Sequence, residues 1–267
     1  MFDSGFGGLT VLRALIGRFP QARFAFIGDT ARLPYGSKSR RTIARYAVES
    51  AQFLVREQGA EFLVIACNTA SALALDAIQA AVPVPVLGVI EPGAMAAGTA
   101  SRTRDVLVIA TDATVQSHAY AAACRAQELR ALEKACPLLV PLVEEGWTNH
   151  PVTWQVIRIY LDELLAEAAD KGLQPDTLVL GCTHYPLIRP LIEASVPSGM
   201  RVIDSAESTA EAALALINGR MAPVGTKAED DALIRCFATD SVDKFQRLGS
   251  RFLGRPVGDV ELVDLGG

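Results

Sequence analysis

Two cysteines in this chain of 267 residues stand in matching local sequences. Residues 63–69 read LVIACNT, and residues 178–184 read LVLGCTH. Each segment runs from an apolar stretch through one small residue to Cys67 or Cys182, and then into polar residues that could open a helix. A single cysteine at the end of a strand is more often structural, but two in matching contexts favour a shared chemical role.

Two opposed thiols have a specific use in proton chemistry. To invert an α-carbon, one group must take a proton from one face while another delivers a proton to the opposite face. A free thiol has a pKa near ~8.5, so help from neighbouring groups gives a useful thiolate near neutral pH. The amino termini of the helices that follow the two cysteines supply part of that help. Asp3, Glu144 and His184, the ionisable residues at other predicted strand ends, can supply the rest.

The elements that must position these side chains follow from the apolar pattern. The runs predicted to be buried strands are 24–27, 62–66, 84–90, 106–110, 138–143, 178–180 and 202–203. The segments predicted to be helices are 39–58, 69–80, 114–133, 153–171 and 208–218. Strands covered on both faces read as continuous apolar runs, and their alternation with helices implies parallel sheets. The predicted fold class is therefore α/β.

Two acidic residues precede the two cysteines at the same spacing. Asp29 ends an apolar run 38 residues before Cys67, and Glu144 ends another run 38 residues before Cys182. A chance match is one explanation, because strand ends look alike. The alternative that we favour is two similar lobes related by pseudo-twofold symmetry. The carboxyl ends of their strands would then face each other across a cleft, where open α/β sheets bind ligands.

Charge and hydropathy exclude several classes of protein. The net charge is −5 and no dense block of Lys or Arg occurs, so we do not expect nucleic acid as a partner. No apolar run is long enough to cross a bilayer, and the first residues lack the pattern of a secretion signal. We therefore expect no membrane association and a cytoplasmic location.

The remaining cysteines and histidines carry no paired context. Five widely spaced cysteines lack the spacing of a zinc site, so we expect free thiols and no metal. We assign Cys124, Cys136 and Cys236 to packing, the last in a helix-like stretch. His118 lies within a predicted helix and His150 in a predicted loop, so neither is a candidate for the site.

Several motifs together resemble glutamate racemase, of the aspartate/glutamate racemase superfamily. They appear in the order of that family, from the first residues to about residue 205. The matching segments are FDSGFGGLT (2–10), Gly28-Asp29 with PYG (34–36), CNTAS (67–71), GVIEPG (88–93), Thr111 with Thr114, Ser117 and Tyr120, and GCTHYP (181–186). The CNTAS and GCTHYP segments are the most specific.

The resemblance implies interconversion of L- and D-glutamate without pyridoxal phosphate or metal, with the D-isomer supplied to peptidoglycan synthesis. It implies that Cys67 deprotonates D-glutamate and Cys182 L-glutamate. Asp3 would tune Cys67, while Glu144 and His184 would assist Cys182. Glu145 is the alternative to Glu144, and the 38-residue spacing favours Glu144.

The resemblance also implies a set of substrate contacts. Small hydroxyls, amides and neighbouring backbone N–H groups suit a ligand with two carboxylates and one ammonium. The expected binders are Asp3, Ser4, Tyr35, Gly36, Asn68, Thr69, Thr111, Thr114, Thr183 and His184. Glutamate is the expected small-molecule partner, and monomer and homodimer both stay open.

The family pattern divides the chain into residues 1–92 plus 207–267 as the first lobe and 93–206 as the second, with crossings at Pro92-Gly93 and around 204–208. Family members usually carry several residues before the FDSG motif, whereas Met1 directly precedes it here. Either the start is misassigned or the chain is truncated. If the first strand is incomplete, we expect Asp3 to be poorly anchored. An apolar extension should then raise the melting temperature.

Two other functions compete with this interpretation. One is a racemase of the same superfamily acting on another acidic amino acid, such as aspartate. The other is a descendant that binds a ligand without catalysis. Two thiols in matching contexts argue against the second, because a binding protein has no need for them.

Overall fold

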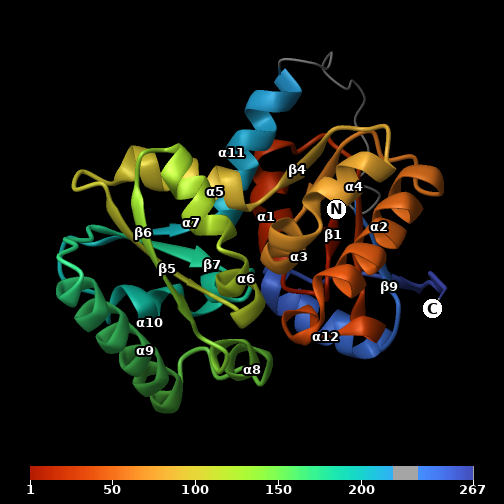
Figure 1. Cartoon of the computed structure of the whole chain (residues 1–267). Coiled ribbons are helices and arrows are strands. Elements are labelled where there is room, and N and C mark those ends of the chain that lie inside the picture. Colours follow the sequence, from red (N-terminus) through yellow and green to blue (C-terminus); the bar gives the residue numbers. More distant parts are fainter. Residues whose placement is uncertain (219–233, 267) are drawn as a thin grey trace.

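The structure, a computed structural model, describes residues 1–218 and 234–266, which form two lobes (Figure 1). The first lobe contains β1 (Phe2–Asp3), β2 (Phe24–Gly28), β3 (Leu63–Ile65), β4 (Val86–Gly88), β9 (Ile234–Ala238) and β10 (Val260–Leu262), in the order β10-β9-β2-β1-β3-β4. The second contains β5 (Asp105–Ala110), β6 (Arg130–Ala135), β7 (Thr177–Gly181) and β8 (Arg201–Asp204), in the order β6-β5-β7-β8. All the described strand pairs are parallel, which confirms the predicted α/β class with two lobes.

The two sheets repeat one strand order. In the first lobe the chain goes from β1 out to β2 on one side and then to β3 on the other, and β5, β6 and β7 do the same in the second. The connections leaving β1 and β3, or β5 and β7, therefore diverge at the carboxyl edge of each sheet and open a crevice there. Cys67 follows β3 and Cys182 follows β7, so the two thiols occupy the same place in the repeat.

Helices connect the strands and cover the sheets. They are α1 (Leu9–Arg18), α2 (Arg40–Arg56), α3 (Asn68–Leu73), α4 (Leu75–Ala81), α5 (Ile90–Ala100), α6 (Asp112–Ser117), α7 (Ala119–Ala126), α8 (Leu139–Glu144), α9 (Pro151–Asp170), α10 (Arg189–Glu193), α11 (Ser205–Asn218) and α12 (Val242–Leu253), with short 3₁₀ turns η1 (Thr30–Arg32), η2 (Tyr35–Ser37) and η3 (Tyr185–Ile188). Strand β5 is buried along its whole length, as expected for a strand covered on both faces. Helix α11 packs against α1 and α5, so it lies between the lobes.

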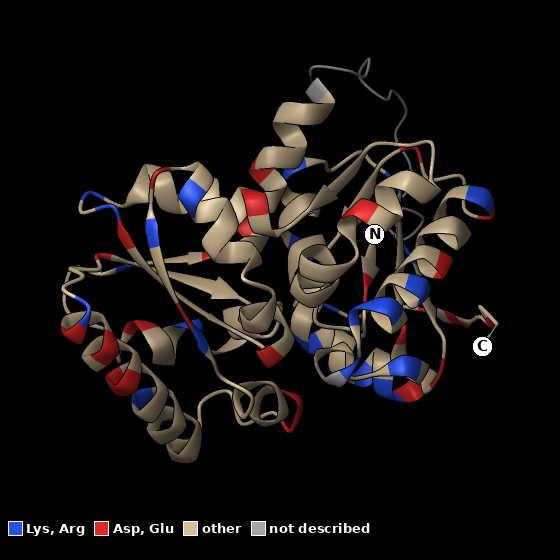
Figure 2. Cartoon of the chain, viewed as in Figure 1, with Lys and Arg blue, Asp and Glu red and all other residues tan. Residues whose placement is uncertain are grey.

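Local sequence explains where the longer helices begin. The Ser39 hydroxyl accepts a hydrogen bond from the Thr42 N–H at the start of α2, and His150 accepts one from Val152 at the start of α9. Pro151 stands at the first position of α9, where its missing N–H costs nothing. Both signs of charge are spread over the two lobes (Figure 2), in keeping with the small net charge.

The prediction for residues 114–143 is wrong in two places. The segment 114–133, predicted as one helix, is α6, α7 and then strand β6. His118 adopts a left-handed conformation, φ 53°, which ends α6. Strand β6 lies at the edge of the sheet and contains charged residues, so it lacks the continuous apolar run by which the other strands were predicted. The segment 138–143, predicted as a strand, is helix α8, so Glu144 ends a helix and not a strand.

The C-terminal part of the chain returns to the first sheet. Cys236, predicted in a helix-like stretch, lies in β9, which pairs with β2. The boundaries given above for the two lobes, at residues 92–93 and 206–207, stay a prediction. Within the described ranges 1–218 and 234–266, no helix has both the length and the apolar character needed to cross a membrane.

Asp3 lies at the centre of the first sheet, contrary to the expectation that it is poorly anchored. Strand β1 pairs with β2 on one side and with β3 on the other, and Asp3 is 2% exposed. The α-amino group of Met1 donates a 2.6 Å hydrogen bond to the Ala25 carbonyl. Burial lowers the pKa of this amino group from 8.0 to about 5.

Adding two or three apolar residues before Met1 should stabilise the protein at mildly acidic pH. Between pH 8 and 5 the unfolded chain binds a proton at this amine that the folded chain does not, so stability falls as the pH falls. A peptide N–H at the same place could make the bond to Ala25 without a charge. At pH 6 the gain should be about 2–3 kcal/mol in urea unfolding, vanishing above pH 8. A gain independent of pH would contradict this explanation.

Candidate active site

Each candidate thiol sits at the carboxyl end of a strand and begins a turn into a helix or 3₁₀ segment. Cys67 caps α3, and the Ala70 N–H donates to its Sγ at 3.4 Å. Cys182 follows β7 and precedes η3. The residues are buried, with Cys67 6% and Cys182 5% exposed, so neither sulfur lies on an outer surface.

Two hydrogen bonds cross between the lobes at the residues next to the thiols. The Tyr120 hydroxyl of the second lobe donates to Asn68 Oδ1, the residue after Cys67, at 2.7 Å. The Thr10 hydroxyl of the first lobe donates to the Thr183 carbonyl, the residue after Cys182, at 3.1 Å. Each thiol is thus adjacent to a residue held by the opposite lobe, so both thiols lie at one interface.

Three predicted substrate binders form a hydroxyl cluster at the same interface. Thr69 Oγ1 of the first lobe lies 3.1 Å from Thr111 Oγ1 and 3.2 Å from Thr114 Oγ1 of the second. The two second-lobe hydroxyls are 2.9 Å apart. A carboxylate entering here could accept from these hydroxyls in place of the bonds they make to one another.

The surroundings of Cys67 favour its neutral form. Its Sγ lies 3.5 Å from Ser4 Oγ. Burial, and then the nearby Asp3 carboxyl, raise the pKa of Cys67 to about 12, and the N–H of Ala70 offsets this only in part. Burial also raises the pKa of Asp3, although its Oδ2 accepts a 3.0 Å bond from the Gly5 N–H. The expectation of a thiolate near neutral pH is therefore wrong for Cys67.

The surroundings of Cys182 carry a positive charge instead. His184 Nδ1 lies 3.9 Å from Cys182 Sγ, and His184 Nε2 lies 3.3 Å from Glu144 Oε1. Burial alone would lower the pKa of His184, but the bonds to Cys182 and Glu144 outweigh it and raise the pKa to about 10. With its pKa at about 10, His184 carries a positive charge at neutral pH, 3.9 Å from the Cys182 sulfur.

Glu144, and not Glu145, is the acid beside His184. Burial alone would raise the pKa of Glu144, but His184 and Lys244 hold it below its ordinary value. Lys244 belongs to α12 of the first lobe, and its Nζ lies 3.7 Å from Glu144 Oε2. The 38-residue spacing chose the acid that lies beside His184, although the strand on which that choice relied is helix α8.

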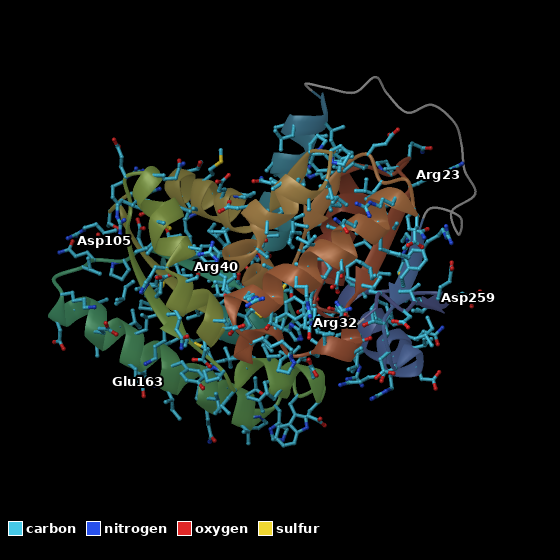
Figure 3. All side chains as sticks on the ribbon, turned by 45° about the vertical axis from the view of Figure 1, so that its right-hand side comes forward. Arg23, Arg32, Arg40, Asp105, Glu163 and Asp259 are labelled. Atoms are coloured by element: carbon cyan, nitrogen blue, oxygen red, sulfur yellow. The ribbon has the colours of Figure 1, made fainter. Side chains whose placement is uncertain are left out.

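The Tyr35–Gly36 turn meets the second lobe, but the Tyr35 side chain is already engaged. Its hydroxyl donates to Asp29 Oδ2 at 2.6 Å, and Asp29 also accepts from Thr239. Arg32, labelled in Figure 3, lies 3.7 Å from the same carboxylate. A Cβ on Gly36 would lie 3.9 Å from Thr111 Cβ, so the turn could reach a ligand through its backbone.

Three residues at the interface were given no role from the sequence. Thr10 and Tyr120 stand inside quoted motifs, and only the three-dimensional structure shows that they cross between the lobes. Lys244 lies beyond the last matching motif, so no pattern pointed to it. Among the described residues, no group of three or more His, Cys, Asp or Glu side chains could hold a metal ion.

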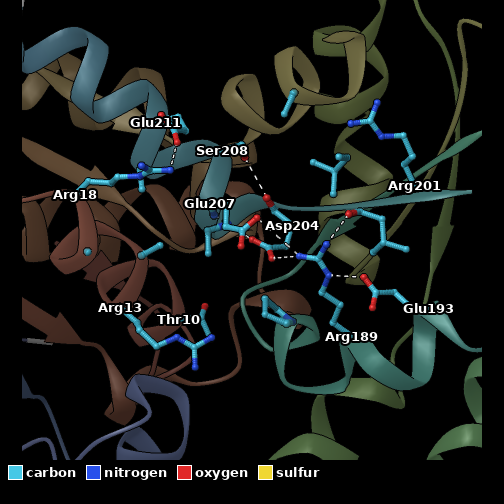
Figure 4. A pocket seen from close by; sticks show the side chains of 18 of the residues that line it. Thr10, Arg13, Arg18, Arg189, Glu193, Arg201, Asp204, Glu207, Ser208 and Glu211 are labelled. Atoms are coloured by element: carbon cyan, nitrogen blue, oxygen red, sulfur yellow. Dashed lines mark hydrogen bonds and ion pairs between the residues drawn. The ribbon is translucent and has the colours of Figure 1, made fainter. Parts of the chain in front are cut away.

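A pocket of about 1030 Å³ lies between α1, α11 and the end of the second sheet, and neither thiol lines it (Figure 4). None of the predicted site residues lines it. Two of its arginines pair with its acids: Arg18 with Glu211, and Arg189 with Glu193 and Asp204. We therefore place the candidate active site at the interface of the thiols and not in this pocket.

Comparison with known proteins identifies relatives over the whole chain. The model of the Asp/Glu/Hydantoin racemase family matches residues 10–213. A glutamate racemase from Koribacter versatilis is 54% identical, covering 100% of this chain and 97% of that protein. The solved glutamate racemase RacE1 from Bacillus anthracis has a TM-score of 0.89 at 36% identity, covering 99% of this chain and 96% of that one.

Two further solved structures bear on the substrate. Glutamate racemase from Francisella tularensis, solved in complex with D-glutamate, has a TM-score of 0.87 at 34% identity and covers 99% of this chain and 96% of that one. Aspartate racemase from Picrophilus torridus has a TM-score of 0.53 at 20% identity over 80% of this chain and 92% of that one. This last likeness is one of fold alone.

Gly7→Ala should force the lobes apart. A Cβ on Gly7 of the first lobe would lie 2.6 Å from His184 Nδ1 of the second, and closer still to Thr183 Oγ1. We expect a loss of ~1–3 kcal/mol in urea unfolding and a larger radius of gyration in X-ray scattering. The control is Gly17→Ala, where nothing lies within 4 Å of the new Cβ and helix α1 gains propensity. Equal behaviour of the two variants would refute the close approach.

Replacing His184 by Gln should remove a pH-dependent part of the stability. Because the pKa of His184 is raised to about 10 in the folded protein, its contribution is full below pH 6.5 and is lost as the pH rises through 10. The urea midpoint of the wild type should therefore fall toward that of His184→Gln between pH 6.5 and 10. In Glu144→Gln, the pKa of His184 should be raised less, so its contribution to stability should be lost at a lower pH than in the wild type. Parallel curves for wild type and His184→Gln would contradict the assignment.

Proposed function

Because the chain belongs to the Asp/Glu/Hydantoin racemase family, as a glutamate racemase, we propose that Cys67 and Cys182 interconvert L- and D-glutamate by moving protons on opposite faces of the α-carbon. The observation that carries this proposal is the pair of interlobe bonds. Tyr120 and Thr10 each reach from one lobe to the residue that follows the other lobe's thiol. Two sulfurs held this way can flank one bound molecule.

The surroundings of the two thiols suit one direction of the proposed reaction. In the L-to-D direction, the Cys182 thiolate beside His184 takes the α-proton of L-glutamate and leaves a carbanion. The Cys67 thiol, neutral because its pKa is raised to about 12, donates its proton to the opposite face. Cys182 ends as a thiol and Cys67 as a thiolate, which is the state needed for the reverse reaction. This assignment of enantiomers to thiols rests on the family resemblance.

The carbanion needs more than a base, since an α-carbon proton is a far weaker acid than a thiol. Hydrogen-bond donors fixed beside the α-carboxylate stabilise the charge that develops there. The hydroxyls of Thr69, Thr111 and Thr114 and the amide of Asn68 are the donors that we propose for the two carboxylates. Burial of both thiols excludes water and strengthens each of these interactions.

We propose that the reaction uses no pyridoxal phosphate and no metal, because the two thiols supply both the base and the acid. The D-glutamate would serve peptidoglycan synthesis, as in the family that the chain resembles. Glutamate is favoured over aspartate as substrate. The relative bound to D-glutamate shares 34% identity, whereas the aspartate racemase shares 20% and a likeness in fold only.

The test is racemisation of L-glutamate in heavy water by purified protein without added cofactor. The wild type should place one deuterium on the α-carbon of the D-glutamate that forms, because the proton it gains comes from a thiol that exchanges with solvent. Cys67→Ser and Cys182→Ser should each lower kcat by about 10³-fold or more, since a hydroxyl is a poor base at neutral pH. Mass spectrometry and a chiral separation measure both quantities.

The matched control is Cys236→Ser, which replaces a buried thiol in β9 of the first lobe. It should keep the turnover of the wild type. Full activity in either of the first two serine variants would exclude the two-thiol mechanism. A requirement for added pyridoxal phosphate, or a preference for aspartate, would overturn the corresponding part of the proposal.

A further inference from the structure

The ring of Tyr120 lies in a slot formed by two glycines. The residue is fully buried on α7 of the second lobe. A Cβ on Gly93 would lie 3.3 Å from its Cε1, and a Cβ on Gly181 would lie 2.8 Å from its Cε2. Because Gly181 immediately precedes Cys182, the ring packs directly against the strand end that carries this thiol.

The hydroxyl of the same side chain reaches the other thiol's segment. It donates to Asn68 Oδ1 at 2.7 Å, and Asn68 immediately follows Cys67. One rigid side chain therefore contacts the neighbours of both thiols, one through its ring and one through its hydroxyl. An aromatic side chain has only two rotatable bonds, so it holds such a spacing with little freedom to lose.

The bond from Tyr120 also decides which way the Asn68 amide faces. If the amide were turned over, its NH₂ group would meet the phenol oxygen and the phenol proton would have no acceptor. The Asn68 oxygen therefore faces Tyr120. The nitrogen, Nδ2, is buried and has no hydrogen-bond partner among the described residues. A buried N–H group without a partner is costly, and a ligand carboxylate would satisfy it.

We propose that Tyr120 is a positioning residue for the racemase reaction. Its ring sets the distance between the two thiol-bearing segments, and its hydroxyl orients the Asn68 amide so that the NH₂ group is free to bind a carboxylate of the substrate. This inference rests on the proposed two-thiol function and adds a residue that touches no reacting atom.

The ring and the hydroxyl can be separated by substitution. Tyr120→Phe keeps the ring in its slot and releases the Asn68 amide, which weakens substrate binding. Loss of one such hydrogen bond corresponds to a roughly tenfold higher KM for both enantiomers, with a smaller change in kcat. Since the two enantiomers have equal free energy, kcat/KM must fall by the same factor in both directions.

A double-mutant cycle tests whether the hydroxyl acts through Asn68. In an Asn68→Ala background, Tyr120→Phe should cause no further rise in KM, whereas independent effects would multiply. The matched control is Tyr160→Phe, which removes a hydroxyl bonded to the Leu138 N–H within the second lobe. The control should keep the KM and kcat of the wild type. A merely structural role for Tyr120 would lower the melting temperature and leave KM unchanged.

Tyr120→Leu tests the ring. Loss of the ring from the slot should let the Gly181 segment move toward Gly93, and a displacement of about 1 Å at a reacting group costs about a hundredfold in kcat. Circular dichroism and the melting temperature establish that the variant is folded. If it is not, Tyr120→Phe and its cycle with Asn68→Ala decide the question alone.

The outcomes separate this inference from the function on which it rests. If neither the wild type nor Tyr160→Phe racemises glutamate, the proposed function fails. If both do and Tyr120→Phe has the KM of the wild type, or if its effect multiplies with that of Asn68→Ala, the positioning role is overturned.

Discussion

The proposed two-thiol chemistry depends on the hydrogen bonds that join the two lobes beside the sulfurs. Without them, Cys67 and Cys182 would be strand-end thiols on two separate sheets. The Tyr120 bond to Asn68 and the Thr10 bond to Thr183 bring the carboxyl edges of the two sheets together. The lobes can come this close because Gly7 has no side chain, since a Cβ there would lie 2.6 Å from His184 Nδ1. Every other interaction of the site, including the threonine cluster, presupposes that the lobes meet here.

A symmetric backbone carries an asymmetric distribution of charge. Both lobes share one strand order and place their thiols at equivalent positions. Cys67 nevertheless lies beside the carboxyl of Asp3, while Cys182 lies beside an imidazole held by Glu144. The first neighbour raises the pKa of Cys67, and the second places a positive charge beside Cys182, so the two thiols lie in unlike electrostatic surroundings. On the proposed mechanism, two unequal halves act on a substrate whose two enantiomers have equal energy.

The sequence predicted the two-lobe α/β architecture and the residues of the candidate site that meet at the interface, and its errors have physical causes. The paired contexts of Cys67 and Cys182 located both thiols because the repeat in the fold is also a repeat in the pattern of strand, small residue and polar turn. Glu144 was chosen through a strand that does not exist, since an apolar run of six residues suits helix α8 as well as a strand. The interlobe role of Tyr120 and the contact of Lys244 with Glu144 could not be predicted, because they depend on how two separately patterned lobes dock. The raised pKa of Cys67 was missed for the same reason, since burial at that interface has no signature in the local sequence.

The low exposure of the thiols has a consequence for the chemical durability of the protein. Peroxides and disulfides react with a thiolate that they can reach, and Cys67 in the described conformation is 6% exposed with its pKa raised to about 12. Contact between the lobes therefore shelters this sulfur from oxidants. Oxidation of Cys67 would therefore require the lobes to part, and its rate in peroxide would measure how often they do.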